Sequence, residues 1–91
     1  MTFGVKYTSR FKKDYKRLQK RGYDMSKLLD VVDLLRTGQP LPEKYQDHPL
    51  HGDYVGHRDC HIESDWVLIY FRSETTLVLS LTRTGTHSDV F

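Results

Sequence analysis

The sequence has little of what secreted and membrane proteins depend on. Cys60 is the one cysteine among 91 residues, so no disulfide can form within the chain and a reducing compartment is expected. The longest apolar run, residues 66–71, is far too short to cross a bilayer. The first residues hold no apolar stretch of the kind found in signal peptides. We therefore expect a soluble, cytoplasmic protein.

Low-complexity runs are also absent, which argues against disorder. Hydrophobic residues make up 37% of the chain, and they include six Tyr, four Phe and one Trp, which is enough for a folded core. A chain of this length is expected to form a single domain over residues 1–91. It buries a modest core, since short chains hide only about 60–65% of their unfolded surface.

The net charge of +2 conceals an uneven distribution. Residues 10–21 carry seven of the 14 Lys and Arg and a single acid, Asp14, whereas the rest of the chain is acidic. Such a concentration favours a polyanion as partner. A solvated helix face explains charge runs about as often, and the pattern alone does not separate the two.

The first half of the chain has the pattern of a strand followed by two helices. Residues 3–8 alternate as a short strand, and residues 10–21 have apolar side chains at helical spacing after Ser9, the expected N-cap. Gly22 is placed to end this helix, and Asp24 is placed to cap the next one. The apolar face of the second helix is expected to consist of Met25, Leu28, Leu29, Val32 and Leu35.

The second half is strand-like. Residues 37–52 form a long loop without periodicity, and loops of this length are often functional. Three strands follow, over residues 54–62, 66–71 and 77–83. Alternation along the first of them places on one face His57, Asp59 and His61. The predicted order is β-α-α-β-β-β, an α+β fold in which a helical hairpin packs on a mostly antiparallel sheet.

Several histidines of this half suggest acid–base chemistry. Imidazole titrates near neutral pH, so one histidine can take the proton of an RNA 2′-hydroxyl while another protonates the leaving 5′-oxygen. His61 lies near a strand end, where Asp65 in the next turn is expected to orient it or to act as base. His87 follows the last strand, and His48 lies on the long loop, from which it can close over the others. Arg83 is expected to stabilise charge on the phosphate, provided that its strand has ended or twisted, because a regular strand would turn it towards the core.

Other chemistries fit less well. On a strand, His57 and His61 lie about 13 Å apart and cannot share an ion, so we expect no metal and no cofactor. Cys60 shares its side of the strand with the apolar Ile62 and is interpreted as a buried structural residue rather than a nucleophile. The plain alternative for each histidine is an ordinary surface residue.

Two aromatic residues are candidates for stacking on an RNA base. For Trp66, core packing is the slightly favoured alternative. Phe91 comes four residues after His87, at the end of the sequence, and has less reason to be core.

Three segments together resemble one protein family: KYQDHPLHG, GHRDCHIESDWVLIY and TRTGTHSDVF. They are similar to the YafQ branch of the RelE/ParE toxin superfamily, and the similarity in element order extends over nearly the whole chain. This resemblance implies a RelE-like, microbial-RNase-like fold. It implies a type II toxin, a ribosome-dependent mRNA endoribonuclease that cleaves in the A site without a metal and inhibits translation. It also implies three partners: a cognate antitoxin in an inhibitory complex, the 70S ribosome and mRNA.

The resemblance also assigns residues. The catalytic positions of the family fall on His48, His61, Asp65, Arg83 and His87. Its C-terminal aromatic falls on Phe91. The basic helix would then bind ribosomal RNA through Lys12, Lys13, Lys16 and Arg17. Ser64 departs from the family, because relatives often have proline there, and this loosens the turn that holds Asp65.

Two questions stay open at this point. The sequence does not decide which histidine is base and which is acid. It also allows a non-enzymatic reading of the same fold, as a ParE-like gyrase inhibitor or a degenerate toxin kept for binding. A pure binding module has no need of the histidine set.

Overall fold

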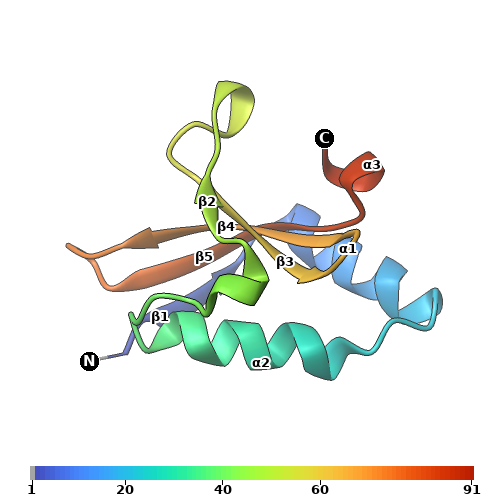
Figure 1. The fold of residues 1–91 in the computed structure, drawn as a ribbon, viewed down its shortest axis with the longest axis horizontal. Coiled ribbons are helices and arrows are strands. Elements are labelled where there is room, and N and C mark those ends of the chain that lie inside the picture. Colours follow the sequence, from blue (N-terminus) through green and yellow to red (C-terminus); the bar gives the residue numbers. More distant parts are fainter. Residues whose placement is uncertain (1) are drawn as a thin grey trace.

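Five strands form one sheet, and the two longer helices cover one of its faces (Figure 1). The computed structural model describes residues 2–91. Its helices are α1 (Ser9–Lys20), α2 (Met25–Arg36), α3 (His87–Val90) and two 3₁₀ turns, η1 (Glu43–Tyr45) and η2 (Gly52–Tyr54). Its strands are β1 (Gly4–Tyr7), β2 (His48–Pro49), β3 (Arg58–Glu63), β4 (Trp66–Ser73) and β5 (Val78–Gly85). The predicted order is confirmed, with β2 and α3 as additions.

The strands are arranged in the order β1-β5-β4-β3-β2. Neighbours are antiparallel except for β1, which pairs with β5 in parallel. The α+β fold class predicted from the sequence is therefore confirmed. Within residues 2–91 no helix has both the length and the apolar character needed to span a membrane.

The helix ends differ from the prediction in one respect. Thr8, not Ser9, is the N-cap of α1, because its hydroxyl accepts the N–H of Phe11 at 3.0 Å and Ser9 is already helical. Gly22 does follow the helix, at a φ of +85° that favours glycine. Asp24 caps α2 as predicted by accepting the N–H of Ser26.

The main core lies between the helices and the sheet. Leu28, Val32 and Leu35 of α2 are buried in it, as predicted. Leu29 is instead 48% exposed, and Val31 is buried in its place. The apolar face of α2 is therefore rotated slightly from the predicted one. Trp66 is also part of this core. It is 1% exposed, its Nε1 donates to the Thr84 hydroxyl at 2.9 Å, and Tyr23 packs edge-on against its ring. The prediction that Trp66 stacks on an RNA base was therefore wrong, because no base can reach the indole.

The opposite face of the sheet is only partly covered. A small apolar cluster of Val67, Ile69 and Val90 lies there, flanked by Leu50 and Tyr54. Because α3 and η2 cover only this cluster, His61 of β3 next to it stays partly accessible from the solvent side, although Asp59 is buried.

A β-bulge in β5 decides which face Arg83 uses. Opposite β4, Tyr70 pairs with Leu81 but the next residue, Ile69, pairs with Arg83, so Thr82 is an extra residue in the ladder. The bulge reverses the alternation of the strand. Arg83 therefore lies on the same face of the sheet as Ile69 and not in the helix-covered core with Leu81. A departure from the regular strand was the condition under which the sequence allowed Arg83 to reach the site.

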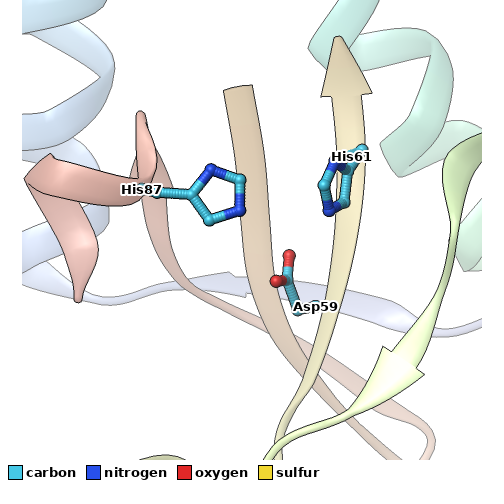
Figure 2. A group of neighbouring side chains, drawn as sticks. All are labelled: Asp59, His61 and His87. Carbon is cyan, nitrogen blue, oxygen red and sulfur yellow. The ribbon is translucent and has the colours of Figure 1, made fainter. Parts of the chain in front are cut away.

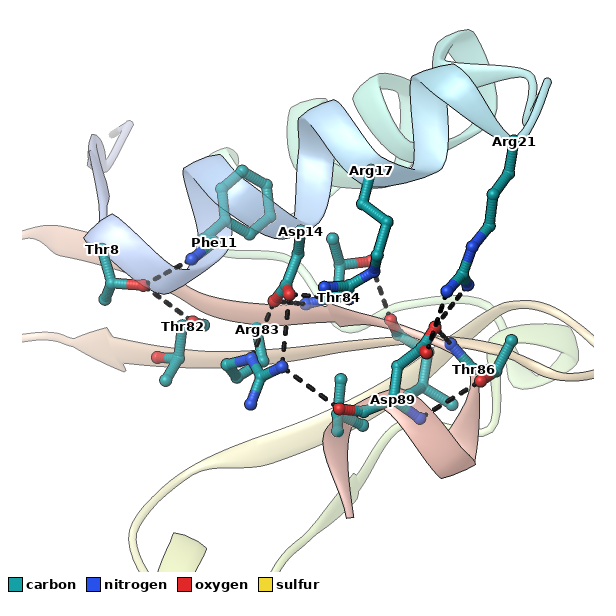
Figure 3. Close-up of polar contacts among 12 residues, drawn as sticks. Thr8, Phe11, Asp14, Arg17, Arg21, Thr82, Arg83, Thr84, Thr86 and Asp89 are labelled. Carbon is teal, nitrogen blue, oxygen red and sulfur yellow. Dashed lines mark hydrogen bonds and ion pairs between the residues drawn. The ribbon is translucent and has the colours of Figure 1, made fainter.

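A buried carboxylate joins α1 to the bulged part of β5 (Figure 3). Asp14 is 2% exposed and accepts hydrogen bonds from Nε and Nη2 of Arg83 at 2.7 and 3.2 Å. It also accepts the backbone N–H of Thr84 at 3.2 Å and Nη2 of Arg17 at 2.8 Å. Each carboxylate oxygen of Asp14 thus accepts two hydrogen bonds, and the pair with Arg83 bridges 69 residues of sequence.

We predict that Asp14→Ala lowers the free energy of unfolding by about 3–5 kcal/mol, because it leaves the buried Arg83 guanidinium without its counter-charge. The measurement is guanidinium chloride unfolding followed by circular dichroism. Asp33→Ala, at an exposed position of α2, is the control and should change stability by less than about 0.5 kcal/mol. Equal, small effects in both variants would show that the ion pair does not hold α1 to the sheet.

Candidate active site

Three polar side chains meet on the open face of the sheet (Figure 2). Asp59 and His61 come from alternate positions of β3, and His87 is the first residue of α3. One ligand-type atom from each lies within 4.8 Å of the others. The His61 and His87 ring centroids are 5.3 Å apart. Histidines separated by 26 positions in the sequence are thus brought together, as the hypothesis of acid–base chemistry requires.

Asp65 orients His87, not His61. Its Oδ1 accepts Nδ1–H of His87 at 2.7 Å and the backbone N–H of the same residue at 3.3 Å. These hydrogen bonds hold the pKa of the Asp65 carboxyl below its usual range. The predicted pairing of Asp65 with His61 was therefore wrong. The turn between β3 and β4 lies beside the start of α3, which sequence distance did not reveal.

His48 reaches the cluster from the edge of the sheet. The loop predicted as irregular contains β2, in which His48 pairs with Asp59. Nδ1 of His48 donates to the carbonyl of Gln46 at 2.7 Å, which leaves Nε2 facing the Asp59 carboxylate at 3.6 Å. The His48 ring lies 6.4 Å from that of His61. His48 therefore belongs to the same group as His61 and His87.

Asp59 is the member of the site that sequence reasoning missed. It is 2% exposed, and its Oδ1 has no hydrogen-bond partner among residues 2–91. Burial raises the pKa of the Asp59 carboxyl, although the three neighbouring histidines act in the opposite direction. The available signal was its parity, because Asp59 alternates onto the same face of β3 as His61.

Arg83 lies at the rim of the site with most of its hydrogen-bonding capacity used. Besides Asp14 it donates from Nη2 to the backbone carbonyl of Asp89 at 3.2 Å, which ties it to α3 (Figure 3). The hydrogen bonds to Asp14 and Asp89 use Nε and Nη2, and Asp14, with a smaller contribution from Tyr54, raises the pKa of the Arg83 guanidinium. The side chain also lines a cavity with Arg10, Tyr54 and Phe91. Arg83 is therefore a largely buried cation of which Nη1 is not used by Asp14 or Asp89.

Phe91 extends the site beyond His87. The two rings are stacked at 6.0 Å, and Tyr54 meets Phe91 edge-on at 5.8 Å. Phe91 is 59% exposed, so one side of its ring is free to receive a planar group. The expectation that it is not a core residue is confirmed.

The basic helix divides into two kinds of side chain. Lys12, Lys13 and Lys16 are exposed, and none forms an ion pair within residues 2–91. Arg17 instead binds Asp14 and is partly buried, so it has a structural contact as well as a charge.

Cys60, the remaining titratable candidate, lies outside the cluster. Burial raises the pKa of the Cys60 thiol well above its usual range, which agrees with a structural cysteine.

Glycine at position 85 allows α3 to fold back close to the site. Its φ is +152°, and a Cβ there would lie 2.8 Å from the Cβ of Asp89. Thr86 and Asp89 form a capping box that fixes the short helix. Arg21 of the α1 end then binds Asp89 at 2.8 Å. His87 and Phe91 are thus positioned by a helix of one turn that is held at several points.

The cluster offers imidazole nitrogens for proton transfer. Nδ1 of His48 and Nδ1 of His87 each donate to an oxygen, so Nε2 is the nitrogen of each ring that can exchange a proton with a substrate. With His61 between them, they provide both a base and an acid within one site. No residue in the group is an activated nucleophile.

Comparison with known proteins points to one family. Residues 3–91 match the family described as "Bacterial toxin of type II toxin-antitoxin system, YafQ". The chain is 46% identical to mRNA interferase toxin YafQ of Escherichia coli K12 over 96% of this chain and 94% of that protein. Among solved structures, YafQ in the E. coli DinJ–YafQ toxin–antitoxin complex has a TM-score of 0.90 and 42% identity over 100% of this chain and 99% of that one. A metal-bound toxin from Helicobacter pylori has a TM-score of 0.91 and 41% identity, with both chains fully covered.

We predict that Asp59→Asn leaves the protein as stable as the parent or more stable at pH 7. At pH 7 the parent holds the ionised Asp59 carboxylate in a buried position. Because burial raises the pKa of this carboxyl, the folded state binds the carboxyl proton more tightly than the unfolded state does. Stability is therefore lost as pH rises through the raised pKa. The gain should disappear as pH falls below about 4, where the carboxyl is protonated in both states. Urea unfolding at both pH values measures this.

Asp30→Asn, on the exposed side of α2, is the matched control and should show no such pH-dependent gain. A clear loss of stability for Asp59→Asn at pH 7 would mean that the histidines more than offset the cost of burying the Asp59 carboxylate.

Proposed function

This chain belongs to the YafQ family of bacterial type II toxins, and we propose that it is an endoribonuclease that cleaves mRNA on the translating ribosome in the cytoplasm. The observation that carries the proposal is the convergence of His48, His61 and His87 around the buried Asp59. The relatives are named mRNA interferases. A gyrase-binding or degenerate toxin has no use for such a group, so the enzymatic reading is favoured over both.

The proposed reaction is attack of the ribose 2′-hydroxyl on the adjacent phosphate. The oxygen–phosphorus bond forms as the bond to the 5′-oxygen breaks, which leaves a 2′,3′-cyclic phosphate and a 5′-hydroxyl. One proton is removed from the 2′-oxygen and one is given to the 5′-oxygen. The protein groups described above can carry out both transfers.

His87 is assigned as the general acid. Asp65 accepts its Nδ1–H, so a proton carried by Nε2 points away from that carboxylate and towards the cluster. The carboxylate stabilises the imidazolium form that an acid must have before it donates, in the same way that the aspartate of a serine protease triad stabilises its histidine. Asp65 is thus a positioning residue that acts through His87.

The base is taken from the other side of the cluster. His48 presents its Nε2, and its ring is fixed by the carbonyl of Gln46. His61 lies between His48 and His87 without such a restraint. We propose His48 or His61 as the base, and we propose that the Asp59 carboxylate stabilises the positive charge that this histidine acquires with the proton. A buried carboxylate next to three imidazoles is suited to this role, since low dielectric strengthens the interaction.

Arg83 and Phe91 are proposed to bind the substrate. Nη1 of Arg83 can stabilise charge on the phosphate, while Asp14 fixes the rest of the guanidinium. A nucleobase stacked on the free side of Phe91 would gain about 1–3 kcal/mol and would place its phosphate near His87.

The partners follow from the family and from the charge distribution. E. coli YafQ forms a complex with the DinJ protein, and we propose that a cognate antitoxin likewise inhibits this chain. We further propose that the exposed lysines of α1 contact ribosomal RNA. Arg10 of the same helix lines the cavity that contains Phe91, so the basic surface continues towards the site.

We predict that His87→Ala lowers single-turnover cleavage on programmed ribosomes by about 10²–10⁴-fold. If His87 is the acid, a substrate whose scissile 5′-oxygen is replaced by sulfur should restore most of the rate, because a thiolate leaves without being protonated. His48→Ala and His61→Ala remove base candidates and should not be restored by the sulfur substrate. Gel analysis of the cleaved mRNA measures each rate.

His57→Ala is the control, since His57 lies outside the cluster and does not line the cavity of Arg83 and Phe91, and it should cleave at near the parental rate. Undiminished cleavage by a folded His87→Ala protein would remove His87 from the mechanism. A loss that sulfur does not restore would assign His87 to another step.

We predict that Lys13→Glu/Lys16→Glu weakens binding to 70S ribosomes and lowers the slope of log affinity against log salt by up to about 2, because fewer counterions are released. Lys6→Glu/Arg36→Glu reverses the same charge away from α1 and should leave the slope near the parental value. Sedimentation binding at several salt concentrations compares the two. Identical slopes would show that the basic face of α1 is only solvated.

A further inference from the structure

His48 lies on a segment that the backbone alone holds weakly. The pairing of β2 with β3 is confined to His48 and Pro49, and both residues are exposed. One further backbone hydrogen bond follows, from the N–H of Leu50 to the carbonyl of His57 at 3.0 Å. An isolated pairing of two residues has little stability of its own. A side-chain contact is therefore needed to keep His48 in place.

Asp47, the residue before β2, makes this contact with two strands of the sheet. Its carboxylate accepts hydrogen bonds from Nε and Nη2 of Arg58 in β3, at 3.1–3.3 Å. Its Oδ1 also accepts the hydroxyl hydrogen of Tyr70 in β4. Arg58 and Tyr70 are paired directly opposite each other in the sheet, and Tyr70 is completely buried in the main core. Asp47 is thus bound to a rigid part of the molecule.

The two donors keep their protons at neutral pH. The hydrogen bond to Asp47 raises the pKa of the Arg58 guanidinium. Burial, followed by the hydrogen bond to Asp47, raises the pKa of the Tyr70 hydroxyl above its usual range. Hydrogen bonds between ionised partners, or to an ionised acceptor, are about twice as strong as neutral ones. The attachment of Asp47 is therefore stronger than the short strand that follows it.

The ring of His48 is held by the residue on the other side of Asp47. Gln46 has a φ of +51°, and its carbonyl accepts Nδ1–H of His48 at 2.7 Å. Asp47 lies between these two residues, so its attachment to the sheet sets the position of both the ring and the acceptor of the ring. Nε2 of His48 then lies 3.6 Å from the Asp59 carboxylate.

We propose that Asp47 is a positioning residue for RNA cleavage: bound by Tyr70 and Arg58, it holds His48 at the site with Nε2 free to accept a proton. The inference rests on the proposed function, in which His48 is a candidate base. Asp47 does not touch the RNA and acts only through His48. Loss of the attachment would let His48 move, and a displacement of about 1 Å can cost about 10²-fold in rate.

The first experiment needs no RNA. Heteronuclear NMR of the imidazole rings distinguishes a neutral histidine protonated at Nδ1 from one protonated at Nε2. In the parent, neutral His48 should carry its proton on Nδ1. In Asp47→Ala and in the milder Tyr70→Phe, we expect His48 to become a mixture of both tautomers, while His87 keeps its proton on Nδ1.

Asp24→Ala is the matched control for this experiment. It also removes an aspartate that accepts hydrogen bonds, and it destabilises the protein through the N-cap of α2, away from β2. Its His48 should have the parental tautomer. Circular dichroism shows which variants are folded. A parental His48 tautomer in folded Tyr70→Phe and Asp47→Ala would overturn the proposal.

The second experiment measures single-turnover cleavage on programmed ribosomes over a range of toxin concentrations. We expect Asp47→Ala to lower the maximal rate by about 10–100-fold, with little change in the half-saturating concentration. Asp47→Asn keeps an oxygen that can accept the Tyr70 hydroxyl, so it should lose less. In a His48→Ala background, Asp47→Ala should lower the rate by less than about threefold further, because both changes remove the same contribution. Equal losses in the two backgrounds would mean that Asp47 acts on the whole fold, and would overturn the positioning role.

The two proposals fail in different ways. A His48→Ala protein that cleaves at the parental rate would contradict the part of His48 in the proposed function, while the NMR spectra would still decide whether Asp47 holds the ring. Loss of cleavage in His48→Ala, together with parental rates in Asp47→Ala and Tyr70→Phe, would contradict the positioning role alone.

Discussion

The ion pair between Asp14 and Arg83 is the interaction on which the geometry of the site depends. It is buried, it joins the middle of α1 to the bulged end of β5, and it also fixes the backbone of Thr84. From Arg83 the contact continues to the carbonyl of Asp89, and from Asp89 to Arg21. The short α3, which carries His87, is therefore attached to α1 through Asp89, directly by Arg21 and indirectly through Arg83. The hydrogen bonds to Asp89 and Thr86 from its own backbone complete this attachment.

A helix of four residues has almost no stability of its own, so its position is a property of these contacts. Arg21 and Thr86 hold the pKa of the Asp89 carboxyl at about 2, well below its usual value. The contribution of this carboxylate to folding is therefore complete above pH 4 and is lost as pH falls towards 2. The site that His87 completes is accordingly held in place over the whole range in which imidazole titrates.

Most of the fold could be predicted from the sequence, because local signals decided it. Hydrophobic spacing placed α1 and α2, and the uniformly apolar residues 66–71 identified the central strand. The parts that could not be predicted depend on contacts between distant segments. β2 has only two residues and no periodicity of its own, since it forms by pairing with β3. The bulge at Thr82 leaves no signature in composition, although it decides on which face Arg83 lies.

The same distinction applies to the site. The segments that resemble the toxin family identified His48, His61 and His87 from the sequence, and the structure brings these three histidines together. The partner of Asp65 was misjudged because Asp65 is near His61 in sequence but near His87 in space. Asp59 was overlooked because a single aspartate in a polar strand has no special pattern until its burial is known. Trp66 stayed a candidate for RNA stacking beside the slightly favoured core position because tryptophan is common both in cores and in stacking sites.

The edge strand β2 has a consequence for self-association. Open sheet edges tend to recruit another chain, because their free N–H and C=O groups are a template for strand addition. Here the edge consists of two residues, and the second, Pro49, has no N–H to offer. This end of the sheet is thus a poor starting point for aggregation. The histidine beside the proline can remain uncovered at an edge that would otherwise attract a neighbouring polypeptide.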